Sequence, residues 1–182
     1  FETLKSNVLI IDEEDGPALL QKRAKILSAD NKANIHFMIM SGFKVDDEAR
    51  MQKLKKYITK HRISVVIIDS LIRIHEGEEN SAKDIAKMFN ELRTLNTKGV
   101  TVLLNHHHRK KPMGKSYDSQ PMRGSGDILA AIDCQMQISH KDDKLYITQT
   151  KNRHGEELKT FSVDIVKQDD KLSLVYSGEK EI

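Results

Sequence analysis

Four short apolar segments recur in the first part of the chain: NVLII at 7–11, IHFMIM at 35–40, ISVVII at 63–68 and VTVLL at 100–104. They are nearly continuous runs rich in Val and Ile, which is typical of strands buried on both faces of a parallel sheet. The segments between them carry apolar residues at helical spacing. Strands that alternate with helices predict βαβ units and a mostly parallel α/β sheet flanked by helices.

Helix boundaries are marked by individual residues between these segments. Pro17 is well placed at the first position of a helix, and a second helical pattern begins near Asp46. Ser81 and Asp84 form a capping box for a third helix, and Gly99 ends it.

The hydrophobic period changes near residue 133. CQMQIS, KLYITQT, TFSVDIV and KLSLVYS, within residues 134–177, alternate apolar and polar positions and are separated by polar turns. This pattern predicts antiparallel strands joined as hairpins. We predict one domain over residues 1–182 with three α/β/α layers, a parallel part at 7–132 and an antiparallel extension at 133–177. Cys134 is predicted to be a core residue.

Composition narrows the class of protein. Charged residues make up 31% of the 182 residues, and no apolar run approaches the roughly 20 residues that span a bilayer. The formal net charge is only +3, so contact with nucleic acid requires a local basic patch. The single cysteine excludes an internal disulfide and a cysteine-based metal site. We expect a cytoplasmic protein without a membrane partner.

Polar residues follow each apolar segment directly: DEED at 12–15, SG at 41–42, DS at 69–70 and NHHHRKK from 105. Ligands of open α/β sheets bind beyond the carboxyl ends of the strands, so these residues predict a phosphate and metal site. An aspartate such as Asp69 can hold Mg²⁺ beside nucleotide phosphates. A carboxylate of DEED can act as general base toward water. For Asp15 we instead expect a stabilising interaction with the dipole of the helix that follows.

The segment after the fourth strand leaves several interpretations open. Its three histidines, 106–108, suit a zinc site with further ligands, a hydrogen-bonded strand end, or a sensor of the nucleotide's terminal phosphate, which we favour. The basic segment 109–126 is either a solvated loop or a contact to nucleic-acid phosphates. Its cations include Arg109, Lys110, Lys111 and Lys115.

The motifs occur in the order LIIDEED, VVIIDSLIRIHEGEEN, VLLNHH, RGSGDILAAID and ITQTKNRHGE. Over about residues 7–160, this order resembles the RecA-like ATPases of the RepA/DnaB hexameric helicase group, in particular the RepA-type ATPases. The resemblance implies a core that uses ATP and Mg²⁺, assembles as a homo-oligomeric ring hexamer, and couples hydrolysis to binding or translocation on single-stranded DNA.

The resemblance also implies roles for individual residues. Glu14 is similar to the glutamate that activates water, Asp69 to the Mg²⁺-associated aspartate with Ser70 beside it, and His106 or His107 to the phosphate sensor. The cation that reaches a neighbouring subunit's nucleotide would be Arg123, Lys151 or Arg153, and the choice among them stays open. DNA contacts are expected at Arg109, Lys110, Lys111 and Lys115.

One motif of the family is not found in these residues. The phosphate-binding loop, G-x-x-x-x-G-K-S/T, does not occur in the sequence. We expect it to precede Phe1 in a longer protein, and we expect this fragment alone to be inactive because the loop cradles the phosphates. The intact protein is predicted to be a plasmid- or phage-type replicative helicase. The alternatives are a non-catalytic RecA-fold module for DNA binding or assembly, and a recombinase or repair ATPase.

Overall fold

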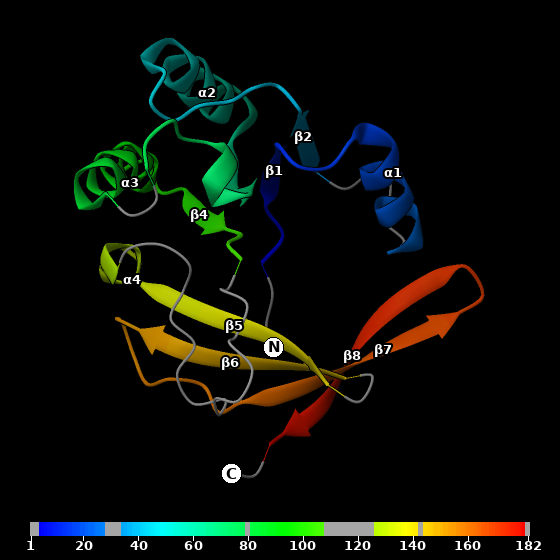
Figure 1. Ribbon diagram of the computed structural model, residues 1–182. Coiled ribbons are helices and arrows are strands. Elements are labelled where there is room, and N and C mark those ends of the chain that lie inside the picture. Colours follow the sequence, from blue (N-terminus) through cyan, green and yellow to red (C-terminus); the bar gives the residue numbers. More distant parts are fainter. Residues whose placement is uncertain (1–3, 28–33, 79–80, 108–125, 142–143, 181–182) are drawn as a thin grey trace. The chain divides into compact units, whose positions relative to one another are not determined.

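The computed structural model (Figure 1) describes residues 4–27, 34–78, 81–107, 126–141 and 144–180. The chain forms two compact units: residues 1–17 with 32–131, and residues 18–31 with 132–182. The boundary after residue 131 lies close to the change of hydrophobic period in the sequence. Within the described ranges, no helix has both the length and the hydrophobicity needed to cross a lipid bilayer.

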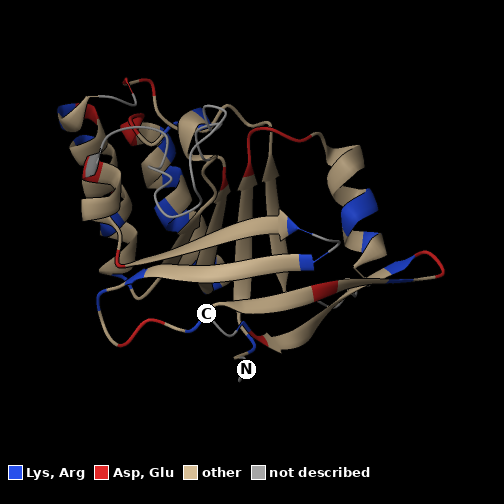
Figure 2. Ribbon diagram, turned by 60° about the horizontal axis from the view of Figure 1, so that its bottom comes forward, with Lys and Arg blue, Asp and Glu red and all other residues tan. Residues whose placement is uncertain are grey.

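A four-stranded parallel sheet forms the centre of the first unit. Its strands lie in the order β2-β1-β3-β4, with Leu9 aligned to Val66 and Ile11 to Ile68. These four side chains are buried on one face. Figure 2 shows acidic residues at the arrowhead ends of parallel strands. The predicted strands are confirmed as β1 (Asn7–Asp12), β2 (Ile35–Ile39), β3 (Ile63–Asp69) and β4 (Thr101–Leu104).

Two helices, α2 (Glu48–His61) and α3 (Ala82–Asn96), cover that buried face (Figure 1). The carboxylate of Asp47 caps α2 by accepting the N–H of Arg50 at 3.0 Å. The hydroxyl of Ser81 caps α3 at 3.3 Å, as the capping box predicted. Apolar side chains one or two turns apart face the sheet: Met51, Leu54 and Ile58 from α2, and Ile85, Met88, Phe89, Leu92 and Leu95 from α3.

The opposite face of the parallel sheet is apolar and more exposed. Phe37, Ile10, Ile67 and Leu103 align in one row across the four strands. Phe37 is 45% exposed and Leu103 is 51% exposed. The continuous apolar runs of the sequence therefore reflect two apolar sheet faces, of which α2 and α3 cover one.

Two short helices complete the first unit. The 3₁₀ helix η1 (Leu71–Arg73) directly follows β3, and α4 (Gly126–Ala131) lies at the start of the described range 126–141. Arg93 of α3 donates a hydrogen bond to the carbonyl of Ala131 at 3.3 Å. This contact holds α4 against α3.

The second unit contains most of α1 (Pro17–Ile26) and an antiparallel sheet in the order β5-β6-β7-β8. The predicted antiparallel extension is thereby confirmed, and α1 begins at the predicted proline. One sheet face is apolar, with Ile138, Ile147 and Phe161 aligned across neighbouring strands. The strands are β5 (Cys134–Lys141), β6 (Lys144–Asn152), β7 (Phe161–Gln168) and β8 (Lys171–Glu179).

Cys134 departs from its predicted place in the core. The residue is exposed at the start of β5, and its sulfur accepts a hydrogen bond from Gln149 Nε2 at 3.1 Å. β5 is an edge strand of its sheet, so its side chains have neighbours on one side only. The prediction of a core cysteine was wrong because the sequence does not reveal which strand lies at the edge.

Candidate functional site

The polar residues that follow β1, β3 and β4 meet at one edge of the parallel sheet. Asp12 and Asp69 are aligned at the ends of neighbouring strands. Glu13 N donates to the carbonyl of Asp69 at 2.7 Å, and Asn105 N donates to the carbonyl of Ile68 at 2.9 Å. Three segments that are distant in sequence therefore form one polar edge, as their positions after apolar runs predicted.

Asp12 forms the turn that carries Glu14. It is only 2% exposed, and its Oδ1 accepts the backbone N–H of Glu14 at 3.0 Å and that of Asp15 at 2.7 Å. Such a turn replaces backbone partners by a side-chain oxygen and sets the direction of the chain leaving the strand. Asp12 was assigned no role from sequence, yet it determines where Glu14 points.

Glu14 lies between two basic side chains. Its Oε1 is 3.6 Å from Arg73 Nε, and its Oε2 is 3.5 Å from His107 Nε2. Arg73 comes from η1, His107 follows β4, and His106 beside it is half-buried. The structure therefore brings together Glu14 and His107, which the sequence analysis had named, and adds Arg73, for which no sequence pattern gave a signal.

Asp69 and Ser70 lie next to this pair at the end of β3. Asn105 Nδ2 donates to Asp69 Oδ2 at 3.0 Å, and the Asp69–Ser70 peptide bond is cis. Ser70 is 1% exposed, and its hydroxyl has no hydrogen-bond partner among the described residues. Asn105 was visible in the sequence as the first polar residue after the fourth strand, although it had no assigned role.

The side-chain oxygens of Asp69 and Ser70 are of the type that binds a hard cation. Mg²⁺ commonly takes one or two protein carboxylates and completes its coordination with water and substrate phosphates. The part of the chain that the structure describes contains no group of three or more His, Cys, Asp or Glu side chains that could hold a metal ion. The carboxylate of Asp69 is of the kind that Mg²⁺ takes as a ligand.

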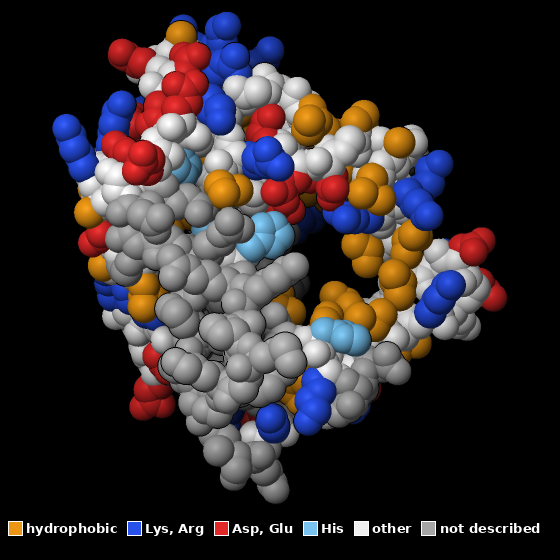
Figure 3. Space-filling view, in the orientation of Figure 1, with side chains coloured by type: hydrophobic (Ala, Val, Ile, Leu, Met, Phe, Trp, Pro, Cys, Tyr) orange, Lys and Arg blue, Asp and Glu red, His pale blue; other side chains and the backbone are white. Residues whose placement is uncertain are grey.

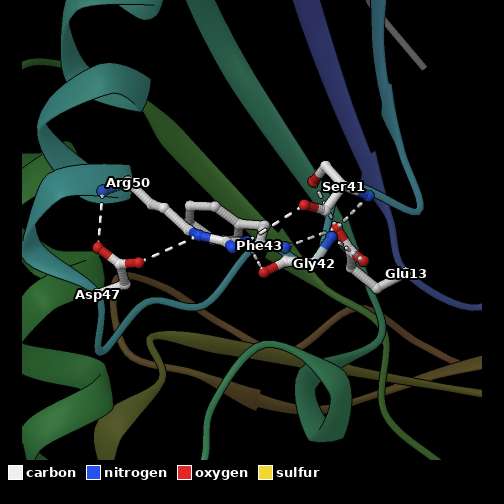
Figure 4. A network of polar contacts seen from close by, with 6 residues as sticks. All are labelled: Glu13, Ser41, Gly42, Phe43, Asp47 and Arg50. Carbon is white, nitrogen blue, oxygen red and sulfur yellow. Dashed lines mark hydrogen bonds and ion pairs between the residues drawn. The ribbon is translucent and has the colours of Figure 1, made fainter.

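Glu13 has a structural role at the same edge (Figure 4). Its carboxylate accepts four hydrogen bonds from the loop after β2. The donors are the Ser41 hydroxyl at 2.6 Å and the backbone N–H groups of Gly42 at 2.9 Å, Phe43 at 3.0 Å and Ser41 at 3.1 Å. Glu13 is thus engaged by this loop, whereas its neighbour Glu14 lies beside Arg73 and His107.

Arg50 of α2 holds the same loop from its other side (Figure 4). Its Nη1 donates to the carbonyls of Ser41, at 3.2 Å, and of Gly42, and its Nε pairs with Asp47 Oδ2 at 3.1 Å. Gly42 has φ +66°, and a Cβ there would lie 3.1 Å from Arg50 Nη1. The positive φ favours glycine at this position, and a Cβ there would require the end of the Arg50 side chain to shift slightly.

Lys151 and Arg153 lie in the second unit at the end of β6. Lys151 is half-buried and aligned with Gln135 of β5. Arg153 Nη1 forms an ion pair with Asp133 Oδ1 at 2.8 Å, and its side chain is still 45% exposed. The roles predicted for these two cations at a neighbouring subunit's nucleotide stay predictions.

The remaining predicted contact residues lie outside the residues that the structure describes. They are the four expected DNA contacts and one candidate for the trans-acting cation: Arg109, Lys110, Lys111, Lys115 and Arg123.

Comparison with known proteins assigns the family and the fold. The AAA domain family matches residues 1–113, more than half of the chain, whereas no curated protein matches the sequence. A solved ATPase domain has a similar fold, with a TM-score of 0.71 and 15% identity over 95% of this chain and 75% of that chain. A DnaB-like replicative helicase, solved in a study of its interactions with primase, is similar with a TM-score of 0.68 and 16% identity.

The second match covers 92% of this chain but 51% of the helicase, so the chain spans about half the length of that protein. Both matches include the parallel sheet flanked by helices and the antiparallel strands, and the predicted RecA-like α/β fold is confirmed. The chain belongs to the AAA domain family and has the RecA-like fold of DnaB-type helicase ATPase domains.

Proposed function

We propose that the chain forms the hydrolytic part of a replicative-helicase-type ATPase that couples ATP hydrolysis to single-stranded DNA in a cytoplasmic ring hexamer. Membership of the AAA domain family and the fold shared with a DnaB-like replicative helicase support this proposal. The observation that carries it is the position of Glu14, between Arg73 and His107 at the carboxyl edge of the sheet, directly after Glu13, whose N–H bonds to the carbonyl of Asp69.

Glu14 is the carboxylate that accepts a proton from the water attacking the terminal phosphate of ATP. A general base must be held within hydrogen-bond reach of the proton that it removes. The turn formed by Asp12 fixes the Glu14 backbone, and the contacts with Arg73 and His107 fix its carboxylate. These contacts orient the Glu14 carboxylate before ATP binds.

Asp69, with Ser70 beside it, would hold Mg²⁺ at this edge. When bound, the ion neutralises negative charge on the phosphates during transfer. Asn105 keeps the Asp69 carboxylate in place through one oxygen and leaves the second without a partner among the described residues.

His107 connects the hydrolytic site to the basic segment that follows it in the sequence. It contacts Glu14 at 3.5 Å, and the chain continues from it through His108 to the cations predicted to bind DNA. We propose that His107, with His106 beside it, reports the presence of the terminal phosphate to Arg109, Lys110, Lys111 and Lys115. Arg123, Lys151 or Arg153 would reach the nucleotide of a neighbouring subunit.

Binding of the phosphates also requires a loop that these residues lack. The sequence contains no G-x-x-x-x-G-K-S/T motif, and the backbone of that motif supplies much of the phosphate cradle. We therefore propose that the 182 residues alone do not hydrolyse ATP and that the loop is contributed by further sequence of the same protein.

The test is ATP turnover by the full-length protein with and without single-stranded DNA. Glu14→Gln should lower turnover by about 10²–10⁴-fold while a fluorescent ATP analogue binds as before. Glu48→Gln, which changes an acid in the first turn of α2, is the matched control and should keep full turnover. Unchanged turnover in Glu14→Gln would remove Glu14 from its role. An intact protein that binds DNA but never hydrolyses ATP would favour the non-catalytic module.

A further inference from the structure

A hollow of about 340 Å³ lies on the first unit between α2 and the end of α3. Figure 3 shows Lys and Arg side chains gathered over α2 at the top of the view. The α2 residues that line the hollow recur every three or four positions and thus share one face of the helix. All lining residues are polar or charged: Gln52, Lys55, Lys56, Thr59, Lys60 and Lys98.

Among the described residues, three of the four lysines have no acidic partner. Lys55 is 16% exposed and lies 3.9 Å from Glu91 of α3, so this pair links the two helices. Lys56, Lys60 and Lys98 are exposed and form no ion pair within the part of the chain that the structure describes. Their combined charge of +3 equals the formal net charge of the whole chain.

The helix ends favour two of these lysines, whereas mutual repulsion opposes one pair of them. Lys60 and Lys98 lie near the ends of α2 and α3, where a helix dipole favours a surface cation by about 0.3–1 kcal/mol. Lys56 and Lys60 are one turn apart on the same helix, and such like-charged pairs oppose helix formation by about 0.2–0.5 kcal/mol. A bound anion would remove this repulsion and use all three charges.

The lining favours a phosphate polymer over other anions. Small-molecule sites are mostly apolar, and no aromatic side chain lines this hollow on which a base could stack. Lysine ammonium groups act as mobile point charges that bind phosphate without a fixed geometry. We propose that the hollow binds backbone phosphates of single-stranded DNA, independently of base sequence. This inference rests on the proposed function in taking DNA as the partner.

Lys56 and Lys60 lie in the second half of α2, away from the first turns of the helix, where Arg50 contacts the loop bonded to Glu13. The carbonyl of His61, at the end of α2, accepts a hydrogen bond from Asn7 Nδ2 at the start of β1, at 2.8 Å. β1 runs from Asn7 to Asp12, a length of about 20 Å at the usual rise per residue. DNA in the hollow would therefore be held at a second contact, separate from the segment that follows His107.

The experiment measures binding of fluorescein-labelled (dT)₂₀ to the full-length protein by anisotropy between 50 and 200 mM NaCl. The test variant replaces Lys56, Lys60 and Lys98 by Gln. Each lost phosphate contact lowers the slope of log K against log salt by about 0.7 for single strands, so the slope should fall by about 2. A control variant removes the same charge from exposed lysines elsewhere: Lys22, Lys25 and Lys167. It should keep the parental slope.

Each of the following outcomes contradicts either this inference or the proposed function. A parental slope in the test variant, with an unchanged circular dichroism spectrum, overturns the inference. Poly-glutamate that competes as well as unlabelled (dT)₂₀ shows a general polyanion surface and also overturns the assignment to DNA. If replacing Lys110, Lys111 and Lys115 removes all salt-dependent binding while the test variant binds normally, the proposed function stands and this inference fails. A parental protein that binds no DNA contradicts the proposed function itself.

Discussion

The carboxylate of Glu13 offers a direct test of how the site edge is held together. Glu13→Ala removes the acceptor of four hydrogen bonds from the loop after β2. The backbone N–H of Phe43 is partly buried. Loss of its hydrogen bond should lower the unfolding free energy by about 1.5–3 kcal/mol, the usual net contribution of a bond to a charged group. The three exposed donors can form hydrogen bonds with water instead, so each lost bond lowers the unfolding free energy by only about 0.5 kcal/mol.

The total is about 3–4.5 kcal/mol of unfolding free energy. With a slope of about 2 kcal/mol per molar urea, the midpoint of the transition should fall by about 1.5–2.3 M. Glu13→Gln keeps one oxygen acceptor and should lose about half as much. Glu48→Ala, which removes an exposed carboxylate in the first turn of α2, is the control and should shift the midpoint little.

Amide hydrogen exchange locates the effect. In Glu13→Ala the amides of Ser41, Gly42 and Phe43 should exchange faster, because each loses its acceptor. The amides of β3 should stay protected at conditions where the protein remains folded. An unchanged urea midpoint together with unchanged exchange at these three amides would refute the reasoning that Glu13 holds the loop.

Three further changes test other parts of the structure. Leu54→Ala removes a side chain that is 1% exposed beneath α2 and should cost about 2–5 kcal/mol in urea unfolding; a loss below 1 kcal/mol would contradict its place in the core. Arg62 caps α2 with φ 51°, a conformation that glycine adopts more readily. Arg62→Gly should therefore raise the unfolding free energy by about 0.5–1 kcal/mol, and with it the melting temperature. A lower melting temperature would contradict this. A hydrogen bond from Ser177 and the nearby Lys144 hold the pKa of Asp164 below its ordinary value. The stabilisation from this carboxylate is therefore present at neutral pH and is lost as the pH falls below about 4. Lys144→Ala should move the NMR titration midpoint of Asp164 upward, and an unchanged midpoint would exclude the ion pair as a cause.

Much of the fold could be predicted because each local signal acts on its own. The four apolar runs became the four parallel strands within one or two residues, Pro17 began α1, and Ser81 capped α3. The hydrophobic period and helix capping depend on residues that are near one another in sequence, so the type of each element is visible in the pattern. The exposed position of Cys134 was not visible, because the order of strands in a sheet depends on pairing between distant segments.

The candidate site shows the same division. The sequence indicated that DEED, DS and NHHH follow strands and that such residues gather at one sheet edge. It did not separate the tasks of Glu13 and Glu14, which are neighbours of identical chemistry. Glu13 is engaged by the loop after β2, 28–30 residues away in sequence, whereas Glu14 meets Arg73 and His107.

The sequence by itself determined the alternation of strands and helices, the change to antiparallel pairing near residue 133, and the chemical types of residue that follow each strand. Only the tertiary structure decided which of these residues meet. Strand pairing in the order β2-β1-β3-β4 sets the distances between side chains that are up to 93 residues apart, as for Glu14 and His107. The lysine hollow has the same origin, because it forms only where α2 lies next to the end of α3. Contacts of this kind depend on how whole elements pack, and no local pattern of the chain encodes that packing.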